Sequence, residues 1–379
     1  MAIHILISAN EAWNIYHFRR GLVQHFLGNG NKVTILAPHD EYSTKLMALG
    51  CHVIDIPISS QGINPYSDAI LFFRYIRYYQ LLSPDLIINY TIKPNIYGSL
   101  AAGLVSVPSI AVTTGLGYTF INNGFVATCA RALYKLSLRF ASQVWFLNAD
   151  DKKTFISHRL VDEKRTYVLN GEGVDVSFFS PRENLGGNET VRFLLIARML
   201  WDKGVGEYVA AAKIIKTKYP NAVFQLLGAS GAENPSAIAE EILVEWQRLG
   251  LVEYLGSKSD VRPLISSSHC VVLPSYREGV PRTLMEASAM ARPVIATNVP
   301  GCSDVVEDGV TGYLCLPRDV DDLASKMELF IMANDAERAR MGVYGREKAM
   351  KDFDENIVIN KYADRIGPIL GTQKTFLVV

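Results

Sequence analysis

The segment from Val271 to Glu286 holds the densest set of side chains that can do chemistry. Its apolar start predicts a buried strand ending at Pro274, followed by a loop and then a helix. The helix is predicted to begin near Pro281, because proline is favoured at the first helical position. Glu278 lies in the loop, and Glu286 lies eight positions later on the helix. Two carboxylates therefore flank the start of a helix.

This arrangement suits a nucleotide sugar. Free N–H groups near Arg282 and Thr283, at the start of the helix, can bind a diphosphate. Carboxylates accept hydrogen bonds from ribose and sugar hydroxyls. The alternative is that Glu278 is an ordinary loop carboxylate and Glu286 a solvated helix residue. The spacing alone is weak, but the Leu-Pro-Ser before it and the Glu-Gly-x-Pro within it favour the binding site.

A second candidate is the turn from Ile196 to Gly204. Arg198 ends a predicted strand and Lys203 opens a predicted helix. Two cations at such a turn can clamp a diphosphate, with lysine acting as a point charge. A basic pair at a turn is more often a solvated surface feature. We favour a site because this turn belongs to the same predicted sheet as the Glu278 loop.

Along the chain around these residues, short β-branched runs alternate with longer segments of helical periodicity. This predicts parallel sheets covered on both faces. A polar stretch rich in Pro and Gly at about 180–190 is typical of an interdomain linker. We predict an α/β fold with two doubly wound Rossmann-like domains over 1–182 and 190–350, and a helix over 351–379 packing back on the first. Ligands are expected in the crevice at the carboxyl ends of the strands. The predicted strands are Ile3–Ser8, Lys32–Ala37, His52–Ile56, Asp85–Asn89, Ser109–Thr113, Gln143–Leu147, Val191–Ala197, Ala222–Leu227, Val252–Leu255, Cys270–Leu273 and Pro293–Ala296.

On these motifs the chain resembles the retaining glycosyltransferases of family four, which have the GT-B fold of two Rossmann-like domains facing a central cleft. The match extends to Leu227-Gly228, to Leu255-Gly256-Ser257 and to Asn170 through Pro181. The resemblance implies that Arg198, Lys203 and Glu278 are catalytic, the first two on the diphosphate and the third on the donor sugar. It implies that Glu286 holds the ribose. The other donor-binding residues that it implies are Gly228, Ser257, Gly279, Val280, Pro281, Arg282 and Thr283.

The N-terminal half is similar to one branch of that family, on the segments Ile15–Arg19, Lys93–Ala102 and Thr114–Phe120. Enzymes of this branch extend a polyprenyl-diphosphate-linked sugar in bacterial O-antigen, capsule or lipid-linked oligosaccharide assembly, several with N-acetylgalactosamine from UDP. One departure is that Val112-Thr-Thr-Gly115 stands where many members have a histidine. The role of that histidine is unassigned in this chain.

Three residues are candidates for the acceptor side, and each has an alternative reading. His17 lies at the cleft edge early in a helix, where a core or capping histidine is common. Lys93 ends the fourth strand and is placed to hold a lipid diphosphate, or it is a solvated loop lysine. Thr114 follows the fifth strand, within a motif of the resembling branch.

Basic residues interleave with aromatic and apolar ones on two helices of the N-terminal half. Residues 1–149 carry 10 basic and 6 acidic side chains, against 28 and 32 in the rest. Such stripes suit an anionic membrane surface, although a packed helix with a solvated face shows the same pattern. The candidate membrane-surface residues are Arg74, Arg77, Arg131, Lys135 and Arg139.

Composition excludes several other classes of protein. The formal net charge of +0 argues against bulk nucleic-acid binding. Five scattered cysteines without a CxxC pair disfavour zinc and disulfide scaffolds. Asp319-Val-Asp321 is interpreted as a helix cap rather than a metal site, so we expect no metal or other cofactor. The start of the chain lacks a secretory signal and no apolar run is long enough to span a membrane. We therefore expect a cytoplasmic protein on the inner face of the cell membrane.

These inferences combine into one functional prediction. The chain is expected to transfer a hexose or N-acetylhexosamine, with α-linked N-acetylgalactosamine as the best guess, from a UDP-sugar to a polyprenyl-diphosphate-linked sugar. The alternatives are a nucleotide-sugar epimerase of the same fold, a transferase that uses GDP-mannose or another UDP-hexose, and a non-catalytic scaffold.

Overall fold

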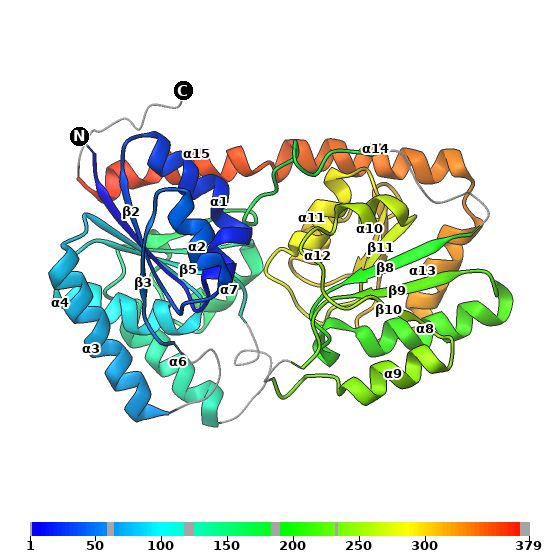
Figure 1. Cartoon of the computed structure of the whole chain (residues 1–379), viewed down its shortest axis with the longest axis horizontal. Helices are drawn as coiled ribbons and strands as arrows, with labels where there is room; N and C mark the ends of the chain where they lie inside the picture. Colours follow the sequence, from blue (N-terminus) through cyan, green and yellow to red (C-terminus); the bar gives the residue numbers. More distant parts are fainter. Residues whose placement is uncertain (1, 59–63, 117–124, 183–189, 232–233, 372–379) are drawn as a thin grey trace. The chain divides into compact units, whose positions relative to one another are not determined.

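The computed structural model describes residues 2–58, 64–116, 125–182, 190–231 and 234–371. The chain divides into two compact units. The N-terminal unit comprises the residues up to Gly173 together with those from Glu355 onward, and the C-terminal unit is Val174–Asp354. Figure 1 shows a sheet with helices on both faces in each unit.

The N-terminal unit is built on a seven-stranded sheet with the order β3-β2-β1-β4-β5-β6-β7. Every described strand pair in it is parallel. Its central strands are buried along their whole length, which explains their continuous apolar runs. The strands are β1 (His4–Ser8), β2 (Lys32–Ala37), β3 (His52–Asp55), β4 (Leu86–Tyr90), β5 (Ser109–Thr113), β6 (Gln143–Phe146) and β7 (Thr166–Val168).

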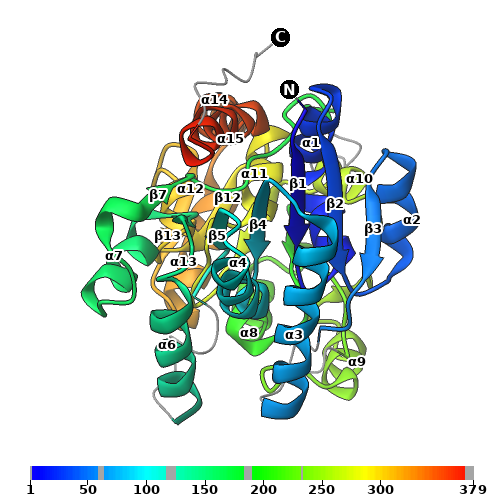
Figure 2. The same ribbon diagram turned by 90° about the vertical axis from the view of Figure 1, so that its left-hand side faces the viewer.

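Helices cover both faces of this sheet. On one face lie α3 (Pro65–Leu82), α4 (Ser99–Leu104) and α6 (Phe125–Ser137), which Figure 2 shows side by side in front of the strands. On the other lie α1 (Ala12–Gly28) and α15 (Glu355–Ile369). The remaining elements are α2 (Glu41–Ala48), α7 (Ala149–Ser157), the π-helical turn η1 (Pro94–Gly98) and the 3-10 turn η2 (Glu163–Arg165).

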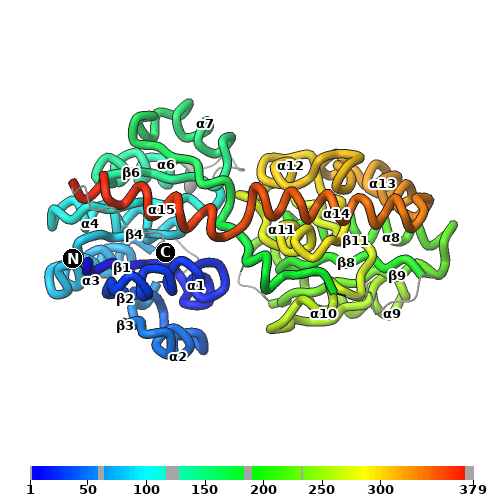
Figure 3. The backbone as a smooth tube through the Cα atoms, turned by 90° about the horizontal axis from the view of Figure 1, so that it is seen from above, coloured from blue at the N-terminus to red at the C-terminus, as the bar shows by residue number. Residues whose placement is uncertain are grey.

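The helix α15 belongs to the N-terminal unit although it lies at the far end of the sequence. Tyr362 packs its ring against Trp145, with centroids 4.7 Å apart, and its hydroxyl lies 2.7 Å from that of Tyr90. Lys361 donates to the carbonyl of Leu169. Figure 3 shows α15 running alongside α1. Buried aromatic contacts thus hold the last helix on the first domain.

The C-terminal unit is built on a six-stranded parallel sheet with the order β10-β9-β8-β11-β12-β13. Helices α8, α9 and α13 cover one face, over a core that includes Phe193, Tyr208, Phe224 and Phe330. Helices α10, α11, α12 and α14 cover the other. The strands are β8 (Arg192–Ile196), β9 (Val223–Leu227), β10 (Glu253–Tyr254), β11 (Cys270–Leu273), β12 (Val294–Thr297) and β13 (Gly312–Cys315). The helices are η3 (Trp201–Lys203), α8 (Val205–Lys218), α9 (Glu240–Arg248), α10 (Arg262–Ser267), α11 (Arg282–Ala289), α12 (Cys302–Val305), α13 (Val320–Met332) and α14 (Asp335–Asp352).

The fold confirms two doubly wound parallel sheets. Within each unit the first and fourth strands are neighbours and the strand order reverses between them, which makes the β1/β4 and β8/β11 gaps the topological switch points. The predicted strands match to within a residue or two, whereas β7 and β13 were not predicted. Pro281 is the cap of α11 rather than its first residue. Most of the predicted linker lies outside the described residues. Among the described helices, none is long and apolar enough to cross a membrane.

Candidate functional site

The predicted donor-binding residues gather at the carboxyl edge of the C-terminal sheet. Arg198 follows β8, Gly228 follows β9, Ser257 follows β10, and the segment from Glu278 to Thr283 follows β11. Because all these strands are parallel, their following loops share one edge. The fold therefore brings together residues up to 85 positions apart.

The loops after β8 and β11 are joined through their backbones at the switch point. The Tyr276 amide donates to the carbonyl of Asp202 over 3.0 Å, and the Ser275 hydroxyl donates to the same carbonyl over 3.2 Å. Gly204 has φ +71, and a Cβ at this position would lie 2.0 Å from the carbonyl oxygen of Pro274. Only glycine allows this close approach, and glycine adopts this backbone conformation at the least cost.

This junction places Lys203 on Glu278. The Nζ of Lys203 donates to Oε1 of Glu278 over 2.6 Å, and the side chains are 22% and 13% exposed. Both groups are thus reachable from solvent but largely shielded, so their electrostatic interaction is stronger than that of a surface pair. The sequence predicted each residue separately as a donor ligand, and their direct pairing is a structural finding.

Glu286 is a buried carboxylate and not a solvated helix residue. It is 9% exposed and accepts a hydrogen bond of 2.9 Å from Nε of Arg282, one helical turn earlier. Burial raises the pKa of Glu286, and the Arg282 guanidinium partly offsets this. The residue lies on α11, whose first N–H groups lie at the carboxyl edge of the sheet. This carboxylate is therefore held rigidly beside a helix N-terminus.

The remaining predicted donor residues form the rim of this edge. Arg198 is exposed and makes no ion pair with any described residue. Gly228 donates its N–H to the Gly256 carbonyl over 2.8 Å and accepts from the Tyr254 hydroxyl over 2.9 Å. A Cβ on Gly228 would lie 1.7 Å from the Ala197 carbonyl oxygen, so only glycine fits. Ser257 is exposed just beyond this contact, whereas Val280 and Pro281 are buried.

Two groups at this edge were not predicted. Gly301, after β12, packs so closely that a Cβ would lie 2.4 Å from the Gly279 carbonyl oxygen. The Tyr276 hydroxyl donates to Glu207 over 2.6 Å, and the Arg318 guanidinium lies 4.4 Å from the centre of the Tyr276 ring. The local signal for Gly301 is the Asn-Val-Pro-Gly turn after a strand. Glu207 and Arg318 have no such signal.

The three predicted acceptor-side residues follow neighbouring strands of the N-terminal sheet. His17 is half-buried on α1 between aromatic rings, with its centroid 4.9 Å from that of Trp13 and 4.7 Å from that of Tyr42. Lys93 is not a solvated loop residue, because its Nζ donates to Asp68 over 2.7 Å. Thr114 is half-buried directly after β5, and most of its predicted motif lies outside the described residues.

The face formed by α3, α4 and α6 carries the predicted membrane-surface residues. Arg74, Arg77, Lys135 and Arg139 are exposed, and Arg131 is half-buried. The three helices contain a single acidic residue, which is buried on α3. Large apolar side chains are exposed among the cations. They are Tyr66, Phe73, Leu81, Leu104, Leu136 and Phe140.

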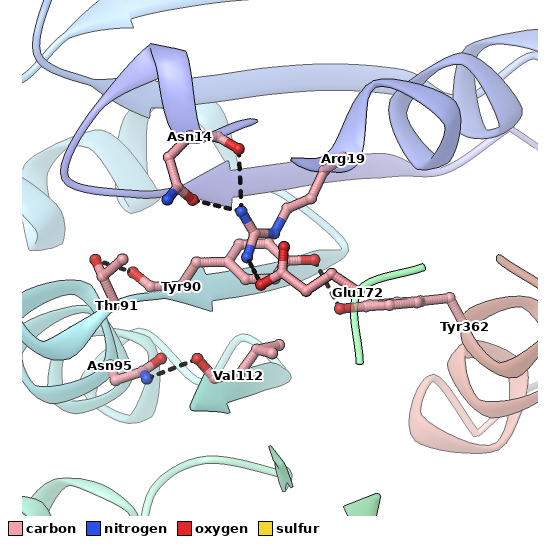
Figure 4. Close-up of polar contacts among 8 residues, drawn as sticks. All are labelled: Asn14, Arg19, Tyr90, Thr91, Asn95, Val112, Glu172 and Tyr362. Carbon is pink, nitrogen blue, oxygen red and sulfur yellow. Dashed lines mark hydrogen bonds and ion pairs between the residues drawn. The ribbon is translucent and has the colours of Figure 1, made fainter. Parts of the chain in front are cut away.

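Arg19, from the N-terminal motif, has a structural role (Figure 4). It is 4% exposed, pairs with Glu172, donates to Asn14, and lies 3.7 Å from the centre of the Tyr90 ring. Burial raises the pKa of Tyr90 to about 12, against the opposing effect of Arg19. Tyr90 in turn meets Tyr362. This network fixes α1, β4 and α15 to one another.

The DxD-like motif caps a helix, as predicted. Asp319 is the N-cap of α13, and its Oδ1 accepts from the amide of Asp322 over 2.9 Å. Within the part of the chain that the structure describes, no group of three or more His, Cys, Asp or Glu side chains is placed to hold a metal ion.

Solved structures share this architecture. The structure of Anabaena HepE in complex with UDP-glucose aligns with a TM-score of 0.80 at 19% identity, covering 97% of this chain and 100% of that one. A glycosyltransferase from Rickettsia africae aligns with a TM-score of 0.79 at 18% identity, over 97% and 99% of the two chains. Together with the strand order, these similarities place the chain among the proteins of GT-B fold.

Sequence relatives identify the family. Residues 190–332 match the model described as glycosyl transferases group 1, and residues 4–148 match a glycosyl transferase 4-like model. The chain is 31% identical over 365 residues, 92% of its length and 94% of the relative's, to the N,N'-diacetylbacillosaminyl-diphospho-undecaprenol alpha-1,3-N-acetylgalactosaminyltransferase of Campylobacter jejuni. It is 24% identical, over 76% of its length and 80% of the relative's, to a UDP-Gal:alpha-D-GlcNAc-diphosphoundecaprenol alpha-1,3-galactosyltransferase of Escherichia coli. This chain belongs to the group 1, family-4-like glycosyltransferases and is a glycosyl-transferring enzyme.

Proposed function

We propose that this enzyme transfers N-acetylgalactosamine, with retention of the α configuration, from UDP-N-acetylgalactosamine to a sugar linked to a polyprenyl diphosphate. The Lys203–Glu278 pair at the switch point carries this proposal. It places a cation, and a carboxylate that can accept hydrogen bonds from sugar hydroxyls, at the point where ligands of such sheets bind. The name of the Campylobacter relative supports the choice of sugar and of a lipid-linked acceptor.

The proposed donor site uses the carboxyl edge of the C-terminal sheet. Arg198, Lys203 and the first N–H groups of α11 bind the diphosphate. Glu286 accepts hydrogen bonds from the ribose, and Gly228 and Ser257 face the base. Glu278 accepts from the hydroxyls of the donor sugar, and the backbone of Gly279 through Thr283 approaches the sugar and phosphate. Arg198 is exposed and Lys203 is shielded, and both side chains supply positive charge to the leaving group.

The reaction breaks the bond between the sugar C1 and the β-phosphate oxygen of UDP and forms one between C1 and an acceptor hydroxyl oxygen. The leaving phosphate takes the acceptor proton, so no protein base and no metal or other cofactor is required. Negative charge develops on the diphosphate as the bond breaks. Lys203, Arg198 and the α11 N-terminus stabilise that charge, and positioning supplies much of the remaining rate.

The lipid-linked acceptor is proposed to reach the enzyme from an anionic cytoplasmic membrane surface. The face of α3, α4 and α6 combines exposed cations with exposed apolar side chains such as Phe73 and Leu104, which suits interfacial binding. Co-sedimentation with anionic vesicles tests this. An Arg74→Glu/Arg77→Glu variant is expected to lose binding, while Lys213→Glu, on exposed α8 surface, is expected to retain it. Equal binding by both variants would contradict the proposed surface.

A transfer assay in detergent micelles tests the reaction itself. A panel of UDP- and GDP-sugars is offered with N-acetylglucosaminyl-diphospho-lipid, and product is read by mass and by the NMR anomeric coupling. An α-linked disaccharide formed from UDP-N-acetylgalactosamine is the expected product. Transfer from another donor would change the assigned donor sugar and leave the proposed reaction in place. A β-linked product, or donor epimerisation without acceptor, would overturn the proposed mechanism.

A further inference from the structure

A shielded ionic cluster lies at the carboxyl edge of the N-terminal sheet. The Nζ of Lys93 donates to Oδ1 of Asp68 over 2.7 Å, and the hydroxyl of Tyr97 donates to Oδ2 over 3.0 Å. Lys93 comes just after β4, Tyr97 belongs to η1, and Asp68 lies near the start of α3. The Lys93 and Asp68 side chains are 15% and 11% exposed. Two side chains of the η1 turn and its cap therefore converge on one carboxylate of α3.

The cluster is costly for a purely structural contact. Removing two charges from water is costly, and apolar replacements of buried pairs are often as stable or more so. The backbone beside it is also unusual. Thr91, a β-branched residue, has φ +70, and Pro94–Gly98 forms a π-helical turn. Strained residues and π-turns gather at functional sites.

The position of the cluster points to a ligand. β4 pairs with β1, and the strand order reverses between them. Ligands of doubly wound sheets bind outside the carboxyl ends of the strands at this point. Figure 4 shows Thr91 at the end of β4, two residues before Lys93 in the chain. The cluster thus lies beyond the end of β4, one of the two strands at the switch point of the N-terminal sheet.

The charges define the ligand's chemistry. Asp68 neutralises Lys93, and no second cation pairs with this cluster among the described residues, whereas Arg198 and the N-terminus of α11 accompany the Lys203–Glu278 pair at its own sheet edge. The lysine ammonium has three N–H donors, of which one is used on a described residue. Each Asp68 oxygen keeps a lone pair after its one contact. Donors and acceptors side by side match the hydroxyl and acetamido groups of a sugar.

We propose that Asp68, Lys93 and Tyr97 form a subsite for the acceptor's sugar ring and bind its hydroxyl or acetamido groups. The proposal rests on the proposed transferase function and replaces the expectation that Lys93 holds the lipid diphosphate. Asp68 positions the ammonium group, and Tyr97 fixes the second carboxylate oxygen. The subsite selects the sugar of the acceptor rather than its lipid or phosphate.

Kinetics of Asp68→Asn and Tyr97→Phe test the subsite. Tyr75→Phe is the matched control, since Tyr75 is buried on the same helix as Asp68 and its hydroxyl lies 2.8 Å from that of Ser8. Both test variants are expected to raise KM for the lipid-linked acceptor at least tenfold and to leave KM for the donor within twofold. The control is expected to leave both constants within twofold. An equal rise in both constants, or no rise in the acceptor KM, would overturn the subsite; if Asp68→Asn does not fold, Tyr97→Phe decides.

A direct binding measurement separates this subsite from the reaction. Saturation-transfer NMR is run with a soluble N-acetylhexosamine glycoside, and phosphorus-31 line broadening follows the binding of inorganic pyrophosphate in a separate sample. The glycoside signal is expected with the wild-type protein and lost in Asp68→Asn, with the pyrophosphate signal unchanged. A change in pyrophosphate binding between the wild type and Asp68→Asn, or no glycoside binding to the wild type, would overturn the subsite. The two proposals can also fail separately. If the glycoside binds the wild type and not Asp68→Asn, but the wild type transfers sugar to no acceptor, the proposed function is contradicted and the subsite is retained.

Discussion

Lys203 Nζ and Glu278 Oε1 lie 2.6 Å apart although their residues are 75 positions apart in the chain. Their loops follow β8 and β11, which are adjacent at the switch point of the sheet. In the proposed donor complex the diphosphate and the donor sugar compete with this internal pair for its two members. The pair therefore keeps both groups in place before the donor binds.

Glu278→Gln separates the two roles of this pair. The variant is expected to retain UDP binding within threefold or to bind UDP more tightly, because Lys203 is released for the diphosphate. Turnover is expected to fall at least about tenfold, equivalent to about 1.4 kcal/mol in the barrier. Calorimetry with UDP and the transfer assay measure the two quantities. Glu328→Gln, which removes the 3.0 Å Lys218–Glu328 surface pair, is the control. Loss of UDP binding in Glu278→Gln would contradict the assignment of Lys203 to the diphosphate and Glu278 to the donor sugar.

Glu286→Gln is expected to weaken UDP binding at least tenfold without lowering thermal stability at pH 7.5. Burial raises the pKa of Glu286, so the folded state holds this proton more readily than the unfolded state. The stabilising contribution is present at low pH and is lost as pH rises through the folded pKa. Removing the charge therefore costs no stability at pH 7.5. Glu245→Gln, which breaks an exposed pair with Arg248, is the matched control. A large fall in melting temperature with unchanged UDP affinity would assign Glu286 a structural role.

Gly204→Ala tests the junction of the loops after β8 and β11. Gly204 and Gly250 have φ +71 and +68, so alanine at either position carries a backbone cost of about 1–2 kcal/mol. A Cβ at Gly204 also meets the Pro274 carbonyl at 2.0 Å, whereas none of the described atoms lies within 4 Å of a Cβ at Gly250. Gly204→Ala is expected to lower the melting temperature more than Gly250→Ala and to reduce turnover. Equal effects of the two substitutions would show that the contact does not matter.

The stability of the C-terminal unit is expected to rise with pH between about 4 and the ordinary histidine pKa near 6.5. Burial, together with Arg338, Arg292 and Arg192, lowers the pKa of His269 to about 4 against the weaker opposite effect of Asp335. Between these two pH values the imidazole of His269 therefore binds a proton in the unfolded state and not in the folded state. His269→Asn, whose side-chain oxygen can replace Nδ1 as acceptor from the Arg192 amide, should flatten the dependence. Thermal unfolding from pH 4.5 to 7.5 measures this, and parallel curves for both proteins would exclude His269 as the cause.

Much of the fold could be predicted from local patterns, because buried parallel strands read as apolar β-branched runs. The two unpredicted strands lack that pattern. β7 is three residues long at a sheet edge, and β13 begins at Gly312 in a segment that reads as a turn. That the proposed donor residues gather at one sheet edge could be predicted, because each follows a strand of the same parallel sheet. The pairing of Lys203 with Glu278, and of Lys93 with Asp68, could not be predicted. It depends on which strands and helices are neighbours in the fold, and the local sequence does not encode this.

Donor diphosphate binding at the β8/β11 switch point is the central claim, and the turnover of Lys203→Ala tests it most directly. Lys213→Ala is the matched control, because Lys213 is an exposed lysine on the helix that follows Lys203. With UDP-N-acetylgalactosamine and the lipid-linked acceptor, Lys203→Ala is expected to turn over at least about tenfold more slowly than the wild type, a loss of about 1.4 kcal/mol. Lys213→Ala is expected to stay within twofold. Near-normal turnover of Lys203→Ala would contradict the donor site.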